Sequence, residues 1–261
     1  MRSSQDLVEK AALLGSLHVP GRPVVLPNAW DVTNARVFAE AGFAAIATSS
    51  GAIANSLGYD DGEYIPRDDM FAAIDRVARA VEIATTADVE RGYGLPADEL
   101  IARLLDAGAV GCNLEDSDPQ TGQLADCDEQ AVWLRAVRAS LDAAAVPIVL
   151  NARVDVHFRA WGAADERLAE AVRRARRYRE AGADCVYPLG LANPSDIERF
   201  VGAVDAPVNI AFRPRGPSFG ELASLGVARV TFGPGLHLAA KSWLASLAAK
   251  LIQGEDPYSS S

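Results

Sequence analysis

The unit from which the fold can be predicted lies in the stretch Ala107-Gly108-Ala109-Val110-Gly111-Cys112-Asn113-Leu114-Glu115-Asp116. A helical segment ends at a small residue and a glycine, a short apolar run follows, and the run ends in two carboxylates. Glycine at a helix end adopts a left-handed conformation without a steric penalty and turns the chain into the strand. The pattern recurs at Gly42, Gly182 and Gly226, which indicates repeated strand–helix units and a parallel sheet covered by helices.

Eight apolar runs are expected to form strands, at Val24–Pro27, Ala44–Thr48, Val81–Ala87, Val110–Leu114, Pro147–Asn151, Cys185–Leu189, Pro207–Ala211 and Val230–Phe232. Helices fit between them, at Asn34–Ala41, Arg67–Ala80, Ala97–Asp106, Glu129–Ala144, Ala164–Ala181, Pro194–Val201, Ser218–Leu225 and Leu236–Leu251. Eight such units in 261 residues predict a single α/β domain, a (β/α)8 barrel of the TIM type. Residues 1–20 are expected to form an N-terminal helix and residues 254–261 a flexible tail. A doubly wound open sheet is the alternative, although no Gly-x-Gly-x-x-Gly sequence follows the first strand.

Charge and cysteine content restrict the classes of partner. The net charge is -10, from 35 Asp and Glu against 25 Lys and Arg, and no basic stripe occurs. We therefore expect no binding to nucleic acid or to anionic membranes. No run approaches the roughly 20 apolar residues that span a bilayer. Three widely spaced cysteines show neither a disulfide framework nor a metal-ligand spacing, which favours a reducing, cytoplasmic location.

Carboxylates follow two of the predicted strands, at the end where a barrel has its active-site mouth. Asp88 and Glu90 follow the third strand, and Glu115 follows the fourth. Burying carboxylates is costly unless a cation offsets the desolvation. If the strand continues through Glu90, then Asp88 and Glu90 point to the same face. With Glu115 they predict an anionic pocket for Mg²⁺, with Mn²⁺ as a substitute, in which some carboxylates bind through water.

Arg153 and the turn Ser49-Ser50-Gly51 complete the predicted pocket. The planar guanidinium of Arg153 suits a substrate carboxylate or an oxyanion that develops during reaction. The turn offers hydroxyls and backbone N–H groups to a second carboxylate oxygen. The alternatives are structural: a salt bridge from Arg153 to Asp155 or Glu115, and a helix cap formed by the serines.

Further polar side chains are expected at the same mouth. His237, after the last strand, is the histidine best placed for acid–base chemistry. Tyr187 is placed to donate to a substrate oxygen or, alternatively, to pack at the rim. The polar loop Ser117–Asp128 is expected to be either a lid over the substrate or an ordinary surface loop. Three further substrate-binding candidates stand at or beside strand ends: Trp30, Asp31 and Asn209.

Taken together, these segments resemble the isocitrate lyase and phosphoenolpyruvate mutase superfamily. Within it, the chain is similar to the small members described as carboxyvinyl-carboxyphosphonate phosphorylmutase-like. The resemblance is carried, in chain order, by Pro27–Asp31, Thr48–Gly51, Leu57–Glu63, Ala87–Gly94, Leu114–Asp116, Asn151–Arg153, Pro207–Asn209 and Gly233–Gly235.

The resemblance implies a modified barrel whose last helix is swapped between the subunits of a homodimer or homotetramer. It implies a bound Mg²⁺ and a 2-oxo acid or phosphoenolpyruvate-like substrate, with a C–C or P–C bond broken or formed beside the carbonyl. By motif match, the metal is bound directly by Asp88 and through water by Glu90, Glu115 and Asp61. The substrate carboxylate is held by Ser50, Gly51 and Arg153.

The chemistry expected of such a site is stabilisation of an enolate, by a divalent Lewis acid and by the charge of Arg153. We therefore expect a Mg²⁺-dependent lyase or decarboxylase of a small 2-oxo or 2-hydroxy dicarboxylate, with Arg153, Glu115, His237 and Tyr187 as catalytic residues. The chain lacks the Lys-Lys/Arg-Cys-Gly-His loop of isocitrate lyases and the Lys-x-Asn pattern of phosphonopyruvate mutases. Two alternatives stay open: a phosphoenolpyruvate or phosphonopyruvate mutase or hydrolase, and a catalytically silent protein that binds oxalate or a 2-oxo acid.

Overall fold

The computed structural model describes residues 4–119 and 121–259, so the outermost residues of the predicted N-terminal helix and tail lie outside the described ranges. Its strands form two hydrogen-bonded parallel sheets. The larger sheet has the order β2 (Asn28–Ala29), β3 (Ala45–Thr48), β4 (Ala84–Asp88), β5 (Gly111–Glu115), β6 (Val149–Val154), β7 (Cys185–Pro188). The smaller sheet has the order β1 (Val24–Val25), β9 (Arg229–Thr231), β8 (Asn209–Ala211).

Two connections join the sheets into a closed ring. β1 and β2 are halves of one extended segment: Leu26 N–H donates to Val230 on one side, and the Pro27 carbonyl accepts from Ala47 on the other. Between β7 and β8, Val186 forms a parallel bridge with residue 208. The expected first strand, Val24–Pro27, therefore contains only β1, and the extended segment continues past Pro27, which has no N–H to contribute to a ladder, into β2. All eight expected strand positions are present, so the barrel is confirmed and the open-sheet alternative is wrong.

The third expected strand differs most from its prediction. β4 begins at Ala84 rather than Val81. Val81 lies just beyond the C-cap of α4 (Arg67–Arg79) and packs in a small apolar cluster with Val77 of α4 and Ile46 of β3. β4 ends at Asp88. Glu90 has a φ of 50°, in the left-handed region, so the expectation that the strand continues through it is wrong.

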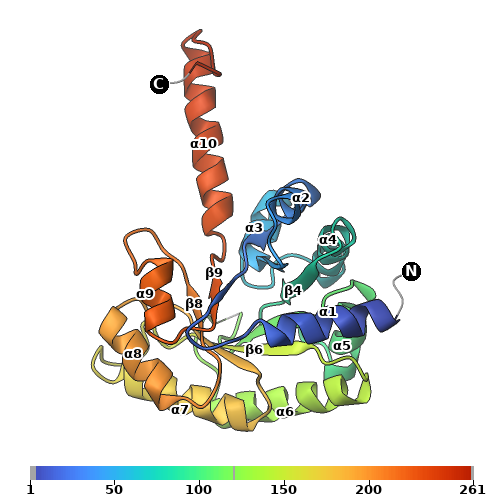
Figure 1. Ribbon diagram of the computed structural model, residues 1–261, viewed down its shortest axis with the longest axis vertical. Helices are drawn as coiled ribbons and strands as arrows, with labels where there is room; N and C mark the ends of the chain where they lie inside the picture. The colour runs from blue at the N-terminus through green and yellow to red at the C-terminus, as the bar shows by residue number, and fades with distance from the viewer. Residues whose placement is uncertain (1–3, 120, 260–261) are drawn as a thin grey trace.

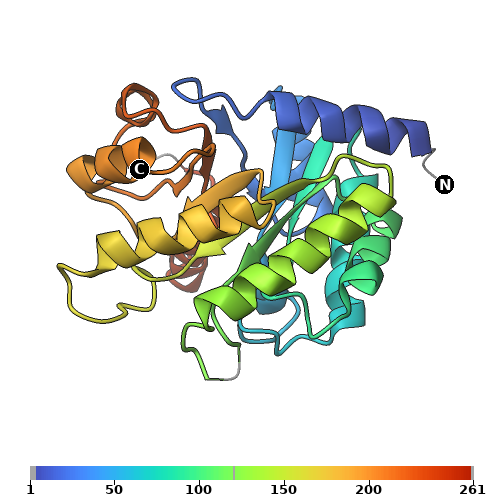
Figure 2. The same ribbon diagram turned by 90° about the horizontal axis from the view of Figure 1, so that it is seen from below.

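Helices cover the outside of the barrel: α2 (Val32–Glu40), α4, α5 (Ala97–Asp106), α6 (Cys127–Ala143), α7 (Arg167–Glu180), α8 (Pro194–Ala203) and α9 (Phe219–Ser224). Figure 2 shows α6 and α7 lying side by side along the barrel. One short helix, α3 (Ser50–Ser56), was not predicted. It begins inside the Ser-Ser-Gly turn, so the chain enters a helix directly from the end of β3.

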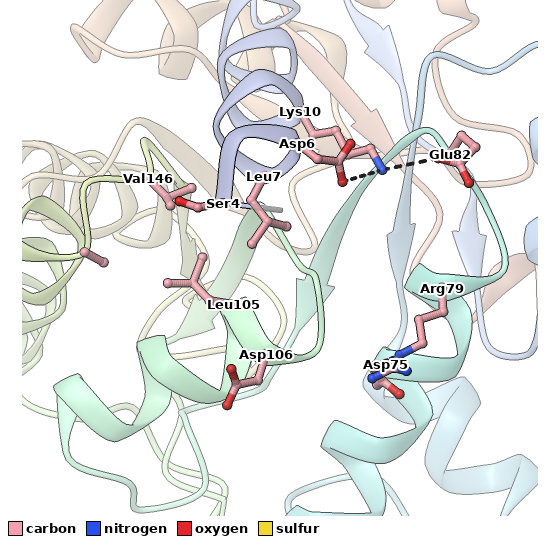
Figure 3. Close-up of a pocket in the computed structure, with 11 residues that line it drawn as sticks. Ser4, Asp6, Leu7, Lys10, Asp75, Arg79, Glu82, Leu105, Asp106 and Val146 are labelled. Atoms are coloured by element: carbon pink, nitrogen blue, oxygen red, sulfur yellow. Dashed lines mark hydrogen bonds and ion pairs between the residues drawn. The ribbon is translucent and has the colours of Figure 1, made fainter. Parts of the chain in front are cut away.

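The N-terminal helix α1 (Ser4–Ser16) lies across the amino-terminal ends of the central strands, where Leu14 is fully buried. Gly111 makes this approach possible, because a Cβ there would lie 2.9 Å from Leu14 Cδ2. A cavity of about 690 Å³, lined by Lys10, Asp75 and Glu82 among others, lies at this end (Figure 3). Glu82 precedes β4, so this cavity is at the opposite end of the barrel from the predicted pocket.

The last helix, α10 (Gly235–Ile252), rises away from the barrel instead of packing against it (Figure 1). The structure describes all of its residues, and none of their side chains is buried. Trp243 is 65% exposed and Ile252 is 90% exposed. An exchange of this helix between subunits stays a prediction. Within the described ranges, no helix has both the length and the apolar character needed to cross a bilayer.

Candidate active site

The carboxyl ends of β3 and β4 bring the serine turn and the first carboxylate together. Asp88 Oδ2 accepts hydrogen bonds from the Ser50 hydroxyl at 2.9 Å and from the Ser50 backbone N–H at 3.2 Å. The same hydroxyl lies 3.4 Å from Asp61 Oδ1. Gly51 leaves room for this, because a Cβ there would lie 3.0 Å from the Asp61 carboxylate. Asp88 Oδ1 accepts no hydrogen bond from any described residue, so it can act as a ligand to a cation.

Glu90 reaches the pocket through a left-handed turn rather than along a strand. Its Oε2 accepts the Glu63 backbone N–H at 2.7 Å, and its Oε1 accepts the Tyr93 hydroxyl at 2.6 Å. The Glu63 carboxylate in turn accepts the backbone N–H groups of Arg91 and Tyr93, at 3.1 and 2.7 Å. The two segments therefore hold each other by reciprocal hydrogen bonds, which fix the orientation of Glu90. Glu63 and Tyr93 were not predicted as site residues.

Arg153 forms both of the salt bridges considered as alternatives. Its Nη1 lies 2.5 Å from Glu115 Oε2, and its Nε and Nη2 donate to the two oxygens of Asp155 at 2.6 and 2.8 Å. Although burial disfavours its charge, Asp155 and Glu115 hold the pKa of Arg153 well above its usual value. Of the five N–H groups of a guanidinium, these contacts use three. The other two stay available to a ligand, so the salt bridges do not exclude the predicted role.

Negative charge is crowded in this pocket. Burial, together with the charges of Asp61 and Asp88, raises the pKa of Glu90 to about 7, although the Tyr93 hydrogen bond opposes the rise. Burial and the charge of Asp88 also raise the pKa of Asp61. A bound divalent cation would reverse this effect by stabilising the ionised carboxylates.

The atoms around Asp88 that could bind a metal ion are all oxygens, which Mg²⁺ and Mn²⁺ prefer as ligands. Throughout the part of the chain that the structure describes, no three His, Cys, Asp or Glu side chains are arranged to bind a metal directly. The arrangement suits an ion that Asp88 binds directly and that other carboxylates reach through water, because Mg²⁺ retains several waters. The ligand roles of Asp88, Glu90, Asp61 and Glu115 stay predictions.

A second, fully buried layer supports the Arg153 side of the pocket. Asp116 accepts the Asp155 backbone N–H at 2.8 Å, the Tyr178 hydroxyl at 2.7 Å and Arg174 Nη1 at 3.0 Å. Ser117 Oγ donates to Asp155 Oδ2 at 2.6 Å. These contacts fix Asp155, which holds Arg153. The network was not predicted, although Arg174 and Tyr178 stand four residues apart on one face of α7 and so offered a signal.

The barrel interior beneath the mouth is polar rather than filled with apolar side chains. Tyr187 stands beside Arg153 in the β6–β7 register, and its buried hydroxyl interacts with the Thr231 side chain, which lowers the pKa of Tyr187 against the larger effect of burial. Thr231 Oγ1 in turn lies 3.2 Å from Asn209 Oδ1. Arg229 is fully buried, and its Nη2 donates to Asn113 at 3.2 Å. Tyr187 and Asn209 therefore face the interior below the pocket, and their roles toward substrate stay predictions. Arg229, which begins β9 one residue before the predicted strand Val230–Phe232, was not predicted as a site residue.

The remaining candidates lie beside the carboxylate cluster rather than in it. Asp31 is the exposed N-cap of α2, and Ser49 is the N-cap of α3, so the capping alternative holds for Ser49 but not for Ser50. His237 Nε2 lies 3.0 Å from Asn55 Oδ1, and its ring packs edge-on against Trp30, with a centroid distance of 4.9 Å. Contacts of these side chains with a substrate stay predictions.

Comparison with known proteins agrees with this geometry. Residues 14–252 match the family model described as phosphoenolpyruvate phosphomutase. An uncharacterized protein of Mycobacterium tuberculosis is 32% identical over 93% of this chain and 92% of its own length. The "Probable 2-methylisocitrate lyase 2" of Corynebacterium glutamicum is 31% identical over 70% of this chain and 60% of its own length. The crystal structure of a "putative phosphonomutase" from Burkholderia cenocepacia J2315 is 43% identical, covers 92% of this chain and 99% of its own, and has a TM-score of 0.89.

The barrel and its acidic mouth thus define a class of α/β-barrel enzymes. The chain belongs to the phosphoenolpyruvate mutase/isocitrate lyase superfamily, which confirms the resemblance found in the sequence. Solved structures of this superfamily are TIM barrels. Its members are lyases, hydrolases or mutases, and they typically depend on Mg²⁺.

Proposed function

We propose that the protein is a Mg²⁺-dependent enzyme that cleaves the C–C bond, or a P–C bond, beside the carbonyl of a small 2-oxo or 2-hydroxy dicarboxylate, through an enolate. One observation carries this proposal: the half-buried Asp88 of β4 and the buried Glu115 of β5 lie at the carboxyl end of the barrel together with Arg153, whose guanidinium pairs with Glu115. When bound, the metal ion supplies a Lewis acid that polarises the 2-oxo group.

The residues of the chain orient the substrate and offset its charge. The two unoccupied N–H groups of Arg153 donate to the oxygen on which negative charge develops, and Asp155 fixes the guanidinium plane through two hydrogen bonds. The Ser50 hydroxyl, which lies beside Asp88, and the adjacent Gly51 backbone N–H receive the substrate carboxylate. A relative that is named as a lyase supports cleavage of a C–C bond.

A second candidate is a phosphoenolpyruvate or phosphonopyruvate mutase or hydrolase. It is favoured by the matching family model and by the 43% identity to the "putative phosphonomutase". The products separate these candidates. A mutase exchanges P–O and P–C bonds within one substrate, a phosphonopyruvate hydrolase releases inorganic phosphate, and a carbon–carbon lyase releases two carbon fragments.

The test is turnover of a panel of 2-oxo and 2-hydroxy dicarboxylates and phosphonates, followed by mass spectrometry with Mg²⁺ or with EDTA. We expect EDTA and Asp88→Asn to abolish release of the enolate-derived product. Asp142→Asn, which removes an exposed carboxylate on α6, is the control and is expected to leave turnover unchanged. Turnover that EDTA does not affect refutes the proposal. Mg²⁺-dependent binding of oxalate without turnover of any panel member favours the catalytically silent alternative.

We also propose that a second copy of the chain covers α10. Apolar side chains exposed along one projecting helix are typical of an interface between subunits. Five such side chains are 55–90% exposed: Leu238, Trp243, Leu244, Leu251 and Ile252. Light scattering is expected to show a dimer or tetramer that Trp243→Glu dissociates and Lys241→Gln, a polar change on the same helix, leaves intact. A monomeric wild type refutes this proposal.

A further inference from the structure

A second arginine lies beside the site, on the segment that follows β6. Arg159 Nε donates to Ser117 Oγ at 2.9 Å, and Ser117 Oγ donates to Asp155, which holds Arg153. The guanidinium carbons of Arg153 and Arg159 lie 5.3 and 5.0 Å from the centroid of the Phe158 ring. The two cations therefore stand at the same side of the mouth, linked by one buried carboxylate and one aromatic ring.

The two arginines differ in how their charge is balanced. Arg153 is held by two carboxylates, Glu115 and Asp155. Arg159 is exposed, and within residues 4–119 and 121–259 no carboxylate pairs with it, because its hydrogen bond goes to the neutral Ser117 hydroxyl. A hydroxyl orients a guanidinium but does not neutralise it. Arg159 thus keeps its charge and most of its donors for an anion that approaches the mouth.

Resting on the proposed function, we infer that Arg159 binds the second carboxylate of the substrate, at the end away from the 2-oxo group. The serine turn and Arg153 receive one end of a dicarboxylate, and the other end needs a cation farther along the same path. Phe158, which is 48% exposed, forms an apolar wall against the intervening carbon. Lysine does not supply this cation, because the three lysines of the chain lie in α1 and α10. Arg159 therefore selects dicarboxylates over monocarboxylates.

A purely structural role for Arg159 makes a different prediction. Its Nη1 lies close to Gly122, since a Cβ on that glycine would be 3.4 Å away. Ser117 and Leu124 form an antiparallel bridge, so Arg159 also contacts the hairpin between them. If Arg159 served only to hold this hairpin, its loss would weaken every ligand by the same factor. If it binds the second carboxylate, its loss weakens only ligands that carry a carboxylate beyond the 2-oxo end, and oxalate, which fills the metal end alone, is unaffected.

Calorimetric titration in the presence of Mg²⁺ separates these roles with three probes. Oxalate tests the metal end alone, 3,3-difluorooxaloacetate carries the second carboxylate, and 3,3-difluoro-2-oxobutyrate lacks it. We expect Arg159→Gln to weaken binding of the dicarboxylate about 10- to 100-fold and binding of the other two less than about 2-fold. Arg159→Lys is expected to restore part of the loss. Arg173→Gln, at a half-exposed arginine of α7 paired with Glu170, controls for a change of net charge.

The outcomes distinguish this inference from the function on which it rests. A wild type that fails to bind oxalate with Mg²⁺ refutes the proposed function and, with it, the role of Arg159. Normal oxalate binding, together with equal weakening of the dicarboxylate and the monocarboxylate in Arg159→Gln, refutes the role of Arg159 alone. An unchanged affinity of that variant for the dicarboxylate does the same.

Discussion

Replacing Glu90 by glutamine tests the electrostatics of the pocket without an assay of turnover. Glu90 is 2% exposed, and the pKa of its carboxyl is raised to about 7 from an ordinary 4.5. Burial is the main cause, and neighbouring carboxylates add to it. Glutamine preserves the local contacts, because its carbonyl can accept the Glu63 N–H while its amide donates to the Tyr93 hydroxyl. The variant therefore removes the titration and keeps the shape.

The sign of the effect follows from proton binding. Between pH 4.5 and about 7 the folded protein holds more protons at Glu90 than the unfolded chain does, so the free energy of unfolding falls as the pH rises. The stability that the protonated Glu90 retains relative to the ionised form is fully present below pH 4.5 and is lost as the pH rises above about 7. One pKa unit corresponds to about 1.4 kcal/mol. Relative to Glu90→Gln, the wild type is expected to lose about 2 to 3 kcal/mol between roughly pH 5 and pH 8.

The assay is urea unfolding of both proteins in EDTA across this interval, repeated with Mg²⁺. Comparing the two proteins isolates Glu90 and the carboxylates coupled to it, because titrating groups that do not interact with Glu90 contribute equally to both. Saturating Mg²⁺ is expected to flatten the difference, since a cation near Asp88 stabilises the ionised form of Glu90. Glu82→Gln, at a fully exposed side chain, is the control and should match the wild type. The same pH dependence in wild type and Glu90→Gln would refute the electrostatic argument.

Three further changes test separate parts of the structure. Ser50→Ala removes a hydroxyl predicted to contact substrate and is expected to weaken oxalate binding about 10-fold in calorimetry. An unchanged affinity would mean that this hydroxyl contacts Asp88 but not the substrate. Tyr178→Phe deprives buried Asp116 of a donor at 2.7 Å and should lower the free energy of unfolding in urea by about 1.5–3 kcal/mol; a negligible change would contradict this. Gly111→Ala places a Cβ 2.7 Å from a threonine hydroxyl and should cost about 1–3 kcal/mol in thermal unfolding. Gly202→Ala, a helical glycine with nothing within 4 Å, should instead be neutral or stabilising.

The fold was predictable because its repeating unit depends on local chemistry. Gly42, Gly108, Gly182 and Gly226 all have positive φ values, from 76° to 104°, which the end of each helix requires and which other residues adopt at a cost. What the sequence did not reveal are departures set by tertiary packing. The first strand divides at Pro27 so that its halves pair with different neighbours, and α10 leaves the barrel although its sequence is as helical as the others.

The sequence predicted which residue types meet at the candidate site, but not the turns and long-range contacts that position them. Parallel strands end at one face, so carboxylates after β4 and β5 were expected to meet there, and their placement follows from topology alone. Glu90 comes to the pocket by a turn with positive φ that no periodicity indicates. The contact of Asp116 with Tyr178 joins residues 62 positions apart. Such a contact depends on how α7 packs against the barrel, which a strand pattern does not specify.

The distribution of charge in the pocket also implies an order of binding. Arg153 is already neutralised by Glu115 and Asp155, so it contributes little net attraction to an incoming dianion. Asp61 and Asp88, which both lie beside the Ser50 hydroxyl, add further negative charge. A dicarboxylate that enters without a cation therefore meets repulsion at its 2-oxo end, and the positive charge at the rim does not offset it. Under the proposed function we therefore expect the metal to bind before the substrate or together with it. Oxalate is expected to show no binding in EDTA, whereas Mg²⁺ binding in the absence of oxalate should be measurable.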